Sequence, residues 1–490
     1  MFPGPNEITR TYASIWSSVI PESEFHVFQQ GGYFVKEVIP DALAVLSLNT
    51  LYFYDNNKAV DGCKKYTKRT PEKDRDPGSS QLDWMEVQLK QLRKRRMQVQ
   101  IIGHVPPTAG NYFKRCYSRY TDIVLRYQDT VIGQHYGHMN VDALFIQEGP
   151  GATVKKLDGT TDEEDGEKDE DAGGLVSITA SDGIVDDLRD EFDTLPGQKR
   201  TNLDRYNFFW AAPSVVPTWW PSVRVWTYNT TRESAFCAQD VLDAQVDEEE
   251  EDDDDGEQQD ERRYTSSRSH RHPKPGKRRR KHHKPYHSSA SSPSRTNRFL
   301  TPLGFSQWVM DIDEENKGFE KWRKREEKKR PNHHRKGRWL GWMIRSIMRQ
   351  DEELEKPHDE KNTPPKPQYQ LEYATYEPEQ LWRAVTGEIE VDFDNGDEVH
   401  RSKWDRPPVP RHLLQLELKR YGLSKRTPGH KMGGTEWLRK LPRALRHRTD
   451  WNVPCLTLDH VMHVARRLAS EDRFWRRYVK RIFSGSGGPA

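Results

Sequence analysis

Residues 131–145 read VIGQHYGHMNVDALF, and this stretch decides the fold. Two apolar runs typical of strands flank Gly137-His138 and Asp142. A sheet fixes the end of a strand rigidly, so a histidine at that point can be aimed at a ligand. The stretch therefore predicts a strand, a functional turn and a second strand. It leaves open what His138 binds and why Asn140 follows two residues later.

The sequence before this stretch indicates an α/β fold. Strand-like runs alternate with helical patterns, an order that predicts a sheet with helices covering its faces. The first helix is expected to open at a capping box formed by Ser80 and Asp83. Its apolar face would carry Leu82, Met85, Leu89 and Leu92. The expected strands are 32–39, 43–53 and 98–104, and a second helix is expected over 112–127.

Composition indicates that much of the chain is solvated. The 490 residues are 33% hydrophobic with a mean hydropathy of −1.00, values typical of chains with long disordered segments. The net charge of +2 hides an acidic block at 247–255 and a basic block at 277–284. No apolar run reaches the ~18 residues of a membrane-spanning helix, and the first residues lack the apolar centre of a signal peptide.

Composition also divides the chain into segments. A compact region comes first, and its sheet is expected to continue beyond an acidic loop. A disordered low-complexity insert follows, then an ordered segment with a basic aromatic helix candidate at 338–349, a linker, and a C-terminal strand and helical region. In chain order, the compact region spans 1–150, the acidic loop 151–174, the continuation of the sheet 175–239 and the insert 240–297. The ordered segment with the helix candidate spans 298–350, the linker 351–367 and the C-terminal strand and helical region 368–490.

Two histidines follow apolar strands, and they are the first candidate site residues. His104 lies in IIGHVPP, and His138 lies in YGHMNVD. Imidazole suits borderline divalent metals, whereas the amide oxygen of Asn140 is a weaker and harder ligand. Either Gly-His alone is more often a hydrogen-bonded strand end. The pair on an α/β background favours a shared site at the carboxyl ends of the strands.

The stretches 101–107 (IIGHVPP) and 111–145 resemble the calcineurin-like metallophosphoesterases of the acid-sphingomyelinase-like branch. That branch carries GHxPP, then a helix ending in an arginine-tyrosine pair, then GHTHxD. The pair is here Arg126-Tyr127, and the last motif reads GHMNVD over 137–142. The form with Met-Asn resembles the fungal vacuolar endopolyphosphatases. Further similar stretches are GPNEITRTYASIW, LAVLSLNTLYFYDNN, APSVVPTWWPSVRVWTYN, TPLGFSQW and RFWRRYVKRIF.

The resemblance implies a fold and an activity. The fold would be the C-terminal part of a metallophosphoesterase β-sandwich with flanking helices, of the α/β (α+β) class. The activity would be hydrolysis of internal phosphoanhydride bonds of inorganic polyphosphate at two divalent metal ions, from Mg, Mn, Co or Zn. His104 and His138 match the ligands of one ion, and Asn140 matches a histidine that binds the other. The resemblance further implies a vacuolar location, a membrane anchor in the full-length protein, and no nucleic-acid partner.

The chain departs from the family pattern in its metal ligands. The family also uses an Asp-x-His, a bridging aspartate and the asparagine of a Gly-Asn motif, with the acid that assists the leaving group nearby, and none of these motifs occurs here. We expect these groups upstream of Met1 in a longer protein, so no catalytic residue is assigned in this chain. Because metal sites usually need three or four protein ligands, this chain alone is expected to bind metal weakly and to cleave little.

Other functions remain open from the sequence. The basic stretches 89–97 and 473–483 would flank the site and could retain polyphosphate without cleaving it. The protein could also be another phosphodiesterase-like (sphingomyelinase-like) protein without catalysis. The basic block 277–284 could contact nucleic acid, although no nucleic-acid fold signature accompanies it. The segment 338–349 could lie on a membrane surface, although packing on the core is favoured.

The cysteines and one sequon give further candidate sites. We hypothesise a Cys63–Cys116 disulfide, because the motif order of the resemblance places both loops on the ligand side of the sheet. Cys237 and Cys455 would form the remaining pair, with buried free thiols as the alternative. Asn229 begins an Asn-Thr-Thr sequon, which would be glycosylated on the oxidising secretory or vacuolar route that also permits disulfides.

Overall fold

The structure is a computed structural model of the 490-residue chain. It describes residues 4–67, 69–71, 75–149, 183–216, 219–231, 290–329, 364–386, 408–422 and 441–486. The expected acidic loop 151–174 and the aromatic helix 338–349 therefore lie outside the described residues. So do most of the insert 240–297 and most of the linker 351–367.

A six-stranded sheet forms the centre of the fold, and its order is β1-β2-β3-β4-β6-β5. The strands β2, β3, β4 and β6 are parallel, whereas β1 and β5 pair antiparallel at the two edges. The expected α/β class is thus confirmed. The bounds are β1 Phe34–Ile39, β2 Leu43–Ser47, β3 Gln98–Ile102, β4 Val131–Tyr136, β5 Ala143–Glu148 and β6 Tyr206–Ala211.

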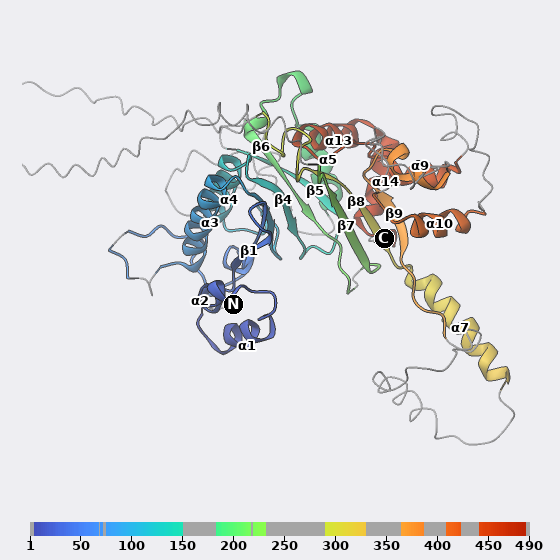
Figure 1. Ribbon diagram of the computed structural model, residues 1–490, viewed down its shortest axis with the longest axis horizontal. Helices are drawn as coiled ribbons and strands as arrows, with labels where there is room; N and C mark the ends of the chain where they lie inside the picture. Colours follow the sequence, from blue (N-terminus) through green and yellow to red (C-terminus); the bar gives the residue numbers. More distant parts are fainter. Residues whose placement is uncertain are drawn as a thin grey trace, which may run out of the picture.

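Two helices cover one face of this sheet, α3 (Pro77–Lys94) and α4 (Lys114–Arg126), which lie side by side in Figure 1. The apolar face expected for α3 is buried. Its start was predicted wrongly, because the cap is Asp76, which accepts from the Ser79 N–H at 2.9 Å, with proline at the first helical position. Ser80 lies one turn into the helix, where its side chain cannot cap.

A second sheet packs on the other face through large aromatic side chains. It consists of β7 (Ser222–Tyr228), β8 (Pro302–Val309) and β9 (Gln370–Ala374), paired antiparallel in that order. Trp210 of β6 is the central contact. Its ring lies 5.8 Å from that of Trp226 and 5.1 Å from that of Phe305. Such aromatic pairs contribute beyond the area they bury, so this cluster joins the two sheets.

The last helices complete the main core. Helix α13 (Leu458–Ser470) packs beside α5 (Ile184–Asp193), and α14 (Asp472–Ile482) follows. Both apolar stripes expected near the C-terminus are buried, which confirms those helices. The stripe residues are Leu458, Val461, Met462, Ala465 and Leu468 in α13, and Phe474, Tyr478 and Ile482 in α14.

The remaining helices lie around this core. The N-terminal pair packs at the β1 edge, and α7 projects away from the body of the molecule (Figure 1). Within the described residues, no helix is long and apolar enough to cross a membrane. The bounds are α1 Glu7–Ile15, α2 Phe25–Gly31, α7 Ile312–Lys329, α9 Pro378–Thr386, α10 Arg411–Arg420 and α12 Arg443–Arg446. The short 3-10 helices are η1 Glu22–Glu24, η2 Thr50–Tyr52, η4 Gln198–Arg200, η5 Leu203–Arg205 and η6 His447–Thr449.

Candidate metal centre

The two motif loops meet where β3 and β4 end. The ladder between these strands continues past them, since Gly103 N–H donates to the His135 carbonyl (3.0 Å) and Gly137 N–H donates to the His104 carbonyl (2.9 Å). Parallel neighbours therefore deliver both loops to one edge of the sheet.

Thr50, which the sequence analysis missed, holds the first loop. Its Oγ1 accepts from the backbone N–H groups of His104 (3.1 Å) and Val105 (2.8 Å). Its methyl group also explains the glycine of the motif, because a Cβ on Gly103 would lie 2.5 Å from Thr50 Cγ2. No sequence motif predicts this contact, because Thr50 lies in a separate 3-10 turn, η2.

The rings of His104 and His138 lie next to each other in an edge-to-face arrangement. Their centroids lie 5.2 Å apart at an interplanar angle of 78°, and the Tyr54 ring packs 5.0 Å from that of His138. Two imidazoles that bind one ion through nitrogens at about 2.0–2.1 Å have ring centres roughly 5 Å apart in a tetrahedral arrangement. The observed spacing therefore fits two ligands of a single divalent ion.

The backbone of the second loop is unusual. His138 and Asn140 both have left-handed conformations, with φ of 67° and 57°. Non-glycine residues occupy this region at a cost of order 1 kcal/mol, and asparagine tolerates it better than most residues. Neither conformation can be inferred from residue types alone, and both residues are half-buried.

Burial sets the charge state of the nearby histidines. It lowers the pKa of His138, and the neighbouring His104 lowers it further, so His138 favours the neutral form that binds metals. Burial, followed by the positive charge of Arg224, lowers the pKa of His135 to about 3. His135 lies 2.8 Å through Nε2 from Gln100 Oε1, and its ring packs 4.6 Å from that of Trp226, contacts that give it a structural role.

The motif carboxylate is directed away from the two histidines. Asp142 is 1% exposed and binds Arg224 and Tyr373 of the second sheet. In the part of the chain that the structure describes, no group of three or more His, Cys, Asp or Glu side chains could hold an ion. At this edge of the sheet the two histidines therefore provide part of a metal shell and not a complete one.

The cysteine pairing expected from the sequence is present for the first pair. Cys63 and Cys116 form a disulfide that joins the loop after η2 to the first turn of α4. Cys455 is buried, with Sγ 3.3 Å from His460 Nδ1. Cys237 lies outside the described residues, so its pairing stays a prediction. Asn229 of the sequon is half-buried, and its Nδ2 donates to Asn297 Oδ1 at 2.8 Å.

Of the two basic stretches expected to flank the site, 89–97 lies elsewhere, whereas 473–483 reaches the second motif loop, where the Ile482 carbonyl accepts from Asp142 N–H at 2.9 Å. Residues 89–97 lie at the amino end of β3, so the five-residue strand separates them from His104 by roughly 16 Å. Arg93 and Arg95 are also paired with acidic side chains. In α14, Arg477 and Arg481 bind Asp450. The two ends of a strand lie at opposite edges of its sheet, so the stretch that precedes β3 cannot flank the residues that follow it.

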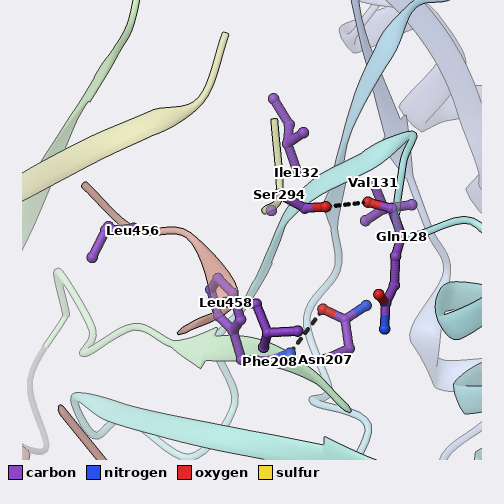
Figure 2. A pocket seen from close by; sticks show the side chains of 9 residues that line it. Gln128, Val131, Ile132, Asn207, Phe208, Ser294, Leu456 and Leu458 are labelled. Carbon is purple, nitrogen blue, oxygen red and sulfur yellow. Dashed lines mark hydrogen bonds between the residues drawn. The ribbon is translucent and has the colours of Figure 1, made fainter. Parts of the chain in front are cut away.

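Two hollows in the described part of the chain differ in their suitability for a substrate. The cavity in Figure 2 lies at the opposite, amino end of β4, where Ser294 Oγ donates to the Gln128 carbonyl at 2.6 Å. Its volume of about 10 Å³ holds one water at most. Ser294 belongs to residues 290–297, which were expected to be disordered but pack on the sheet here. The second hollow, of about 290 Å³, is lined by His135 and Arg224, among others. Since Asp142 neutralises Arg224, this hollow has no net positive charge for a polyanion.

The two sheets and the paired histidines are consistent with an α/β fold of the metallophosphoesterase type. No family model matches the chain. Three fungal proteins named Endopolyphosphatase are similar. The protein of Cryptococcus neoformans is 35% identical over 369 residues, which are 65% of this chain and 53% of that protein. The protein of Yarrowia lipolytica is 36% identical over 46% of this chain and 32% of its own length, and that of Saccharomyces cerevisiae is 30% identical over 46% and 40%.

The chain is therefore a relative of the fungal endopolyphosphatases, and the resemblance found in its sequence is confirmed. It spans about half the length of the first of these proteins and a smaller share of the other two.

Proposed function

We propose that this chain contributes a metal-binding half-site to a phosphohydrolase that cleaves internal phosphoanhydride bonds of inorganic polyphosphate. The observation that carries the proposal is the pair of imidazoles, 5.2 Å apart at the carboxyl ends of two parallel strands. The relatives named Endopolyphosphatase support the substrate. The full activity would also require ligands beyond the described residues.

Each residue of the half-site has a proposed task. His104 and His138 would hold one divalent ion, and the amide oxygen of Asn140 would serve a second, for which Mg or Mn is the better match. A bound ion would supply Lewis acidity toward phosphoryl oxygens. Thr50 fixes the first loop, and Tyr54 supports the ring of His138. Burial, followed by the neighbouring His104, lowers the pKa of His138, which favours the neutral imidazole with an available nitrogen lone pair.

The test uses the 490-residue chain, long-chain polyphosphate and Mg²⁺, Mn²⁺, Co²⁺ or Zn²⁺, with product length read on gels. We expect little cleavage from the chain itself and weak metal binding, both reduced further by His138→Ala. The matched control is His412→Ala, on the exposed face of α10. Cleavage at an ordinary enzymatic rate that His138→Ala leaves unchanged would contradict the site.

Retention of polyphosphate without hydrolysis is the second candidate function. It is favoured by the absence of a cluster of three or more ligands among the residues that the structure describes. The two functions separate in one experiment, since a binding module retains polyphosphate on a column while the chain-length distribution stays unchanged.

We further propose an acidic, oxidising compartment such as the vacuole. The Cys63–Cys116 disulfide supports an oxidising route. Burial raises the pKa of Glu191 and of Glu372 to about 8, so both acids favour the fold in their protonated form. Glycosylation at Asn229 belongs to the same proposal, and mass spectrometry of the secreted chain tests it.

A further inference from the structure

Asp142, the last residue of GHMNVD, is bound on every side. Its Oδ1 receives Arg224 Nη2 at 2.5 Å, and its Oδ2 accepts from the Tyr373 hydroxyl at 2.6 Å. Its backbone N–H donates to the Ile482 carbonyl at 2.9 Å. These partners come from β7, β9 and α14, so this one residue connects the second loop to three distant elements, two through its side chain and one through its backbone.

The partners of Asp142 are themselves fixed. The Arg224 side chain is 5% exposed, and its guanidinium carbon lies 4.1 Å from the centre of the Phe305 ring. Arg224 Nε donates to Gln307 Oε1 at 2.9 Å. Removal of one partner from a buried ion pair is strongly destabilising, because the other charge is left uncompensated. The contacts of Asp142 with Arg224 and Tyr373, here called the anchor, therefore resist small displacements.

The loop needs such an anchor because its conformation is strained. His138 and Asn140 are left-handed, and such residues persist only where the surroundings determine them. At the start of the loop, Gly137 N–H donates to the His104 carbonyl. At its end stands Asp142. These two attachments lie on either side of His138 and Asn140, the residues of the loop that belong to the candidate site.

We infer that Asp142 is a positioning residue whose contacts with Arg224 and Tyr373 hold loop 137–142 so that His138 faces His104. The inference rests on the proposed function in one respect, since it treats His138 as the ligand being positioned. It also implies that the second sheet helps to position a site residue, although neither Arg224 nor Tyr373 lies in the sequence motif of His104 or of His138.

The test compares three variants of the 490-residue chain. Asp142→Asn keeps the shape of the side chain but removes its charge, and Tyr373→Phe removes one hydrogen bond. The matched control is Glu417→Gln, because Glu417 is also a buried acid (side chain 2% exposed) that pairs with Arg420 and Arg448, but it does not contact the loop. Hydrogen–deuterium exchange of the peptide over 137–142 is measured without metal, and Co²⁺ affinity is measured from its absorption spectrum.

We expect the loop amides to exchange at least about tenfold faster in Asp142→Asn and severalfold faster in Tyr373→Phe, with no change in Glu417→Gln. Co²⁺ affinity should fall about 10- to 100-fold in Asp142→Asn, the range typical for lost outer partners of ligands. The inference is overturned if the loop amides of Asp142→Asn exchange at the rate of the parent chain. It is also overturned if the loop amides of Glu417→Gln exchange as fast as those of Asp142→Asn. If the parent binds no Co²⁺, the proposed metal site fails, while the exchange data still decide the role of Asp142.

Discussion

Removal of the Cys63–Cys116 disulfide should destabilise the protein strongly. The double substitution Cys63→Ala/Cys116→Ala deletes a link between the loop that follows η2 and the first turn of α4. Both residues are buried, and Cys63 N–H donates to the Asp76 cap of α3 at 3.1 Å. The link thus fixes two helices relative to the loops that carry Thr50 and His104.

The magnitude follows from the length of chain that the bond closes. The two cysteines are 53 residues apart in sequence. Chain-entropy arguments give about 4 kcal/mol at 25 °C for a loop of this length, through restriction of the unfolded state. Most single substitutions cost less, about 0.5–3 kcal/mol, so this effect should stand out.

The assay is urea unfolding followed by tryptophan fluorescence. The parent treated with reductant should match the double variant, and the variant itself should not respond to reductant. A response of the variant would point to a second disulfide at Cys455. A loss of less than about 1 kcal/mol in the free energy of unfolding would refute the reasoning from chain length.

Further outcomes are expected from single substitutions. Glu191 has a pKa of about 8, so the folded state binds a proton that the unfolded state releases above about 4.5, and stability should fall as pH rises between these values. Glu191→Gln keeps the acceptor for Ile146 N–H and should flatten this decline in melting temperature, whereas parallel curves would contradict the assignment. Trp210→Ala should cost about 3–5 kcal/mol in urea unfolding, because the ring is 2% exposed and joins the sheets. Arg95→Ala should leave the melting temperature unchanged, since its ion pairs are exposed.

The sequence predicted the elements whose pattern is local. The spacing of Leu82, Met85 and Leu89 defined the inner face of α3, because every third or fourth side chain returns to one side of a helix. The ends of elements were less predictable. The strand expected over 43–53 ends at Ser47, and a 3-10 turn begins at Thr50, although the apolar composition continues. An apolar composition indicates that a segment is buried, but it does not distinguish a buried strand from a buried 3-10 turn.

The site was predictable only in part for a related reason. His104 and His138 follow parallel strands, so their meeting is a consequence of sheet geometry. Thr50 and Tyr54 act through contacts between loops, which no spacing encodes. The partners of Asp142 are 82 and 231 residues away along the chain.

The position of the low-complexity insert explains how Arg224 stays in place beside Asp142 despite the long chain segment that follows β7. The described residues stop at 231, after β7, and resume at 290, before β8, and these two strands pair along their whole length. Just after β7, Asn229 N–H donates to the Thr301 carbonyl at 2.9 Å, and Leu300 N–H donates to the Asn229 carbonyl at 2.7 Å. Loop-closure entropy grows only with the logarithm of length, by about 0.6 kcal/mol for each doubling. Since the two ends of the insert are already adjacent, its length and charge place little strain on Arg224 of β7. The pairing of β7 with β8 can therefore keep Arg224 in place beside Asp142 whatever the length of the insert.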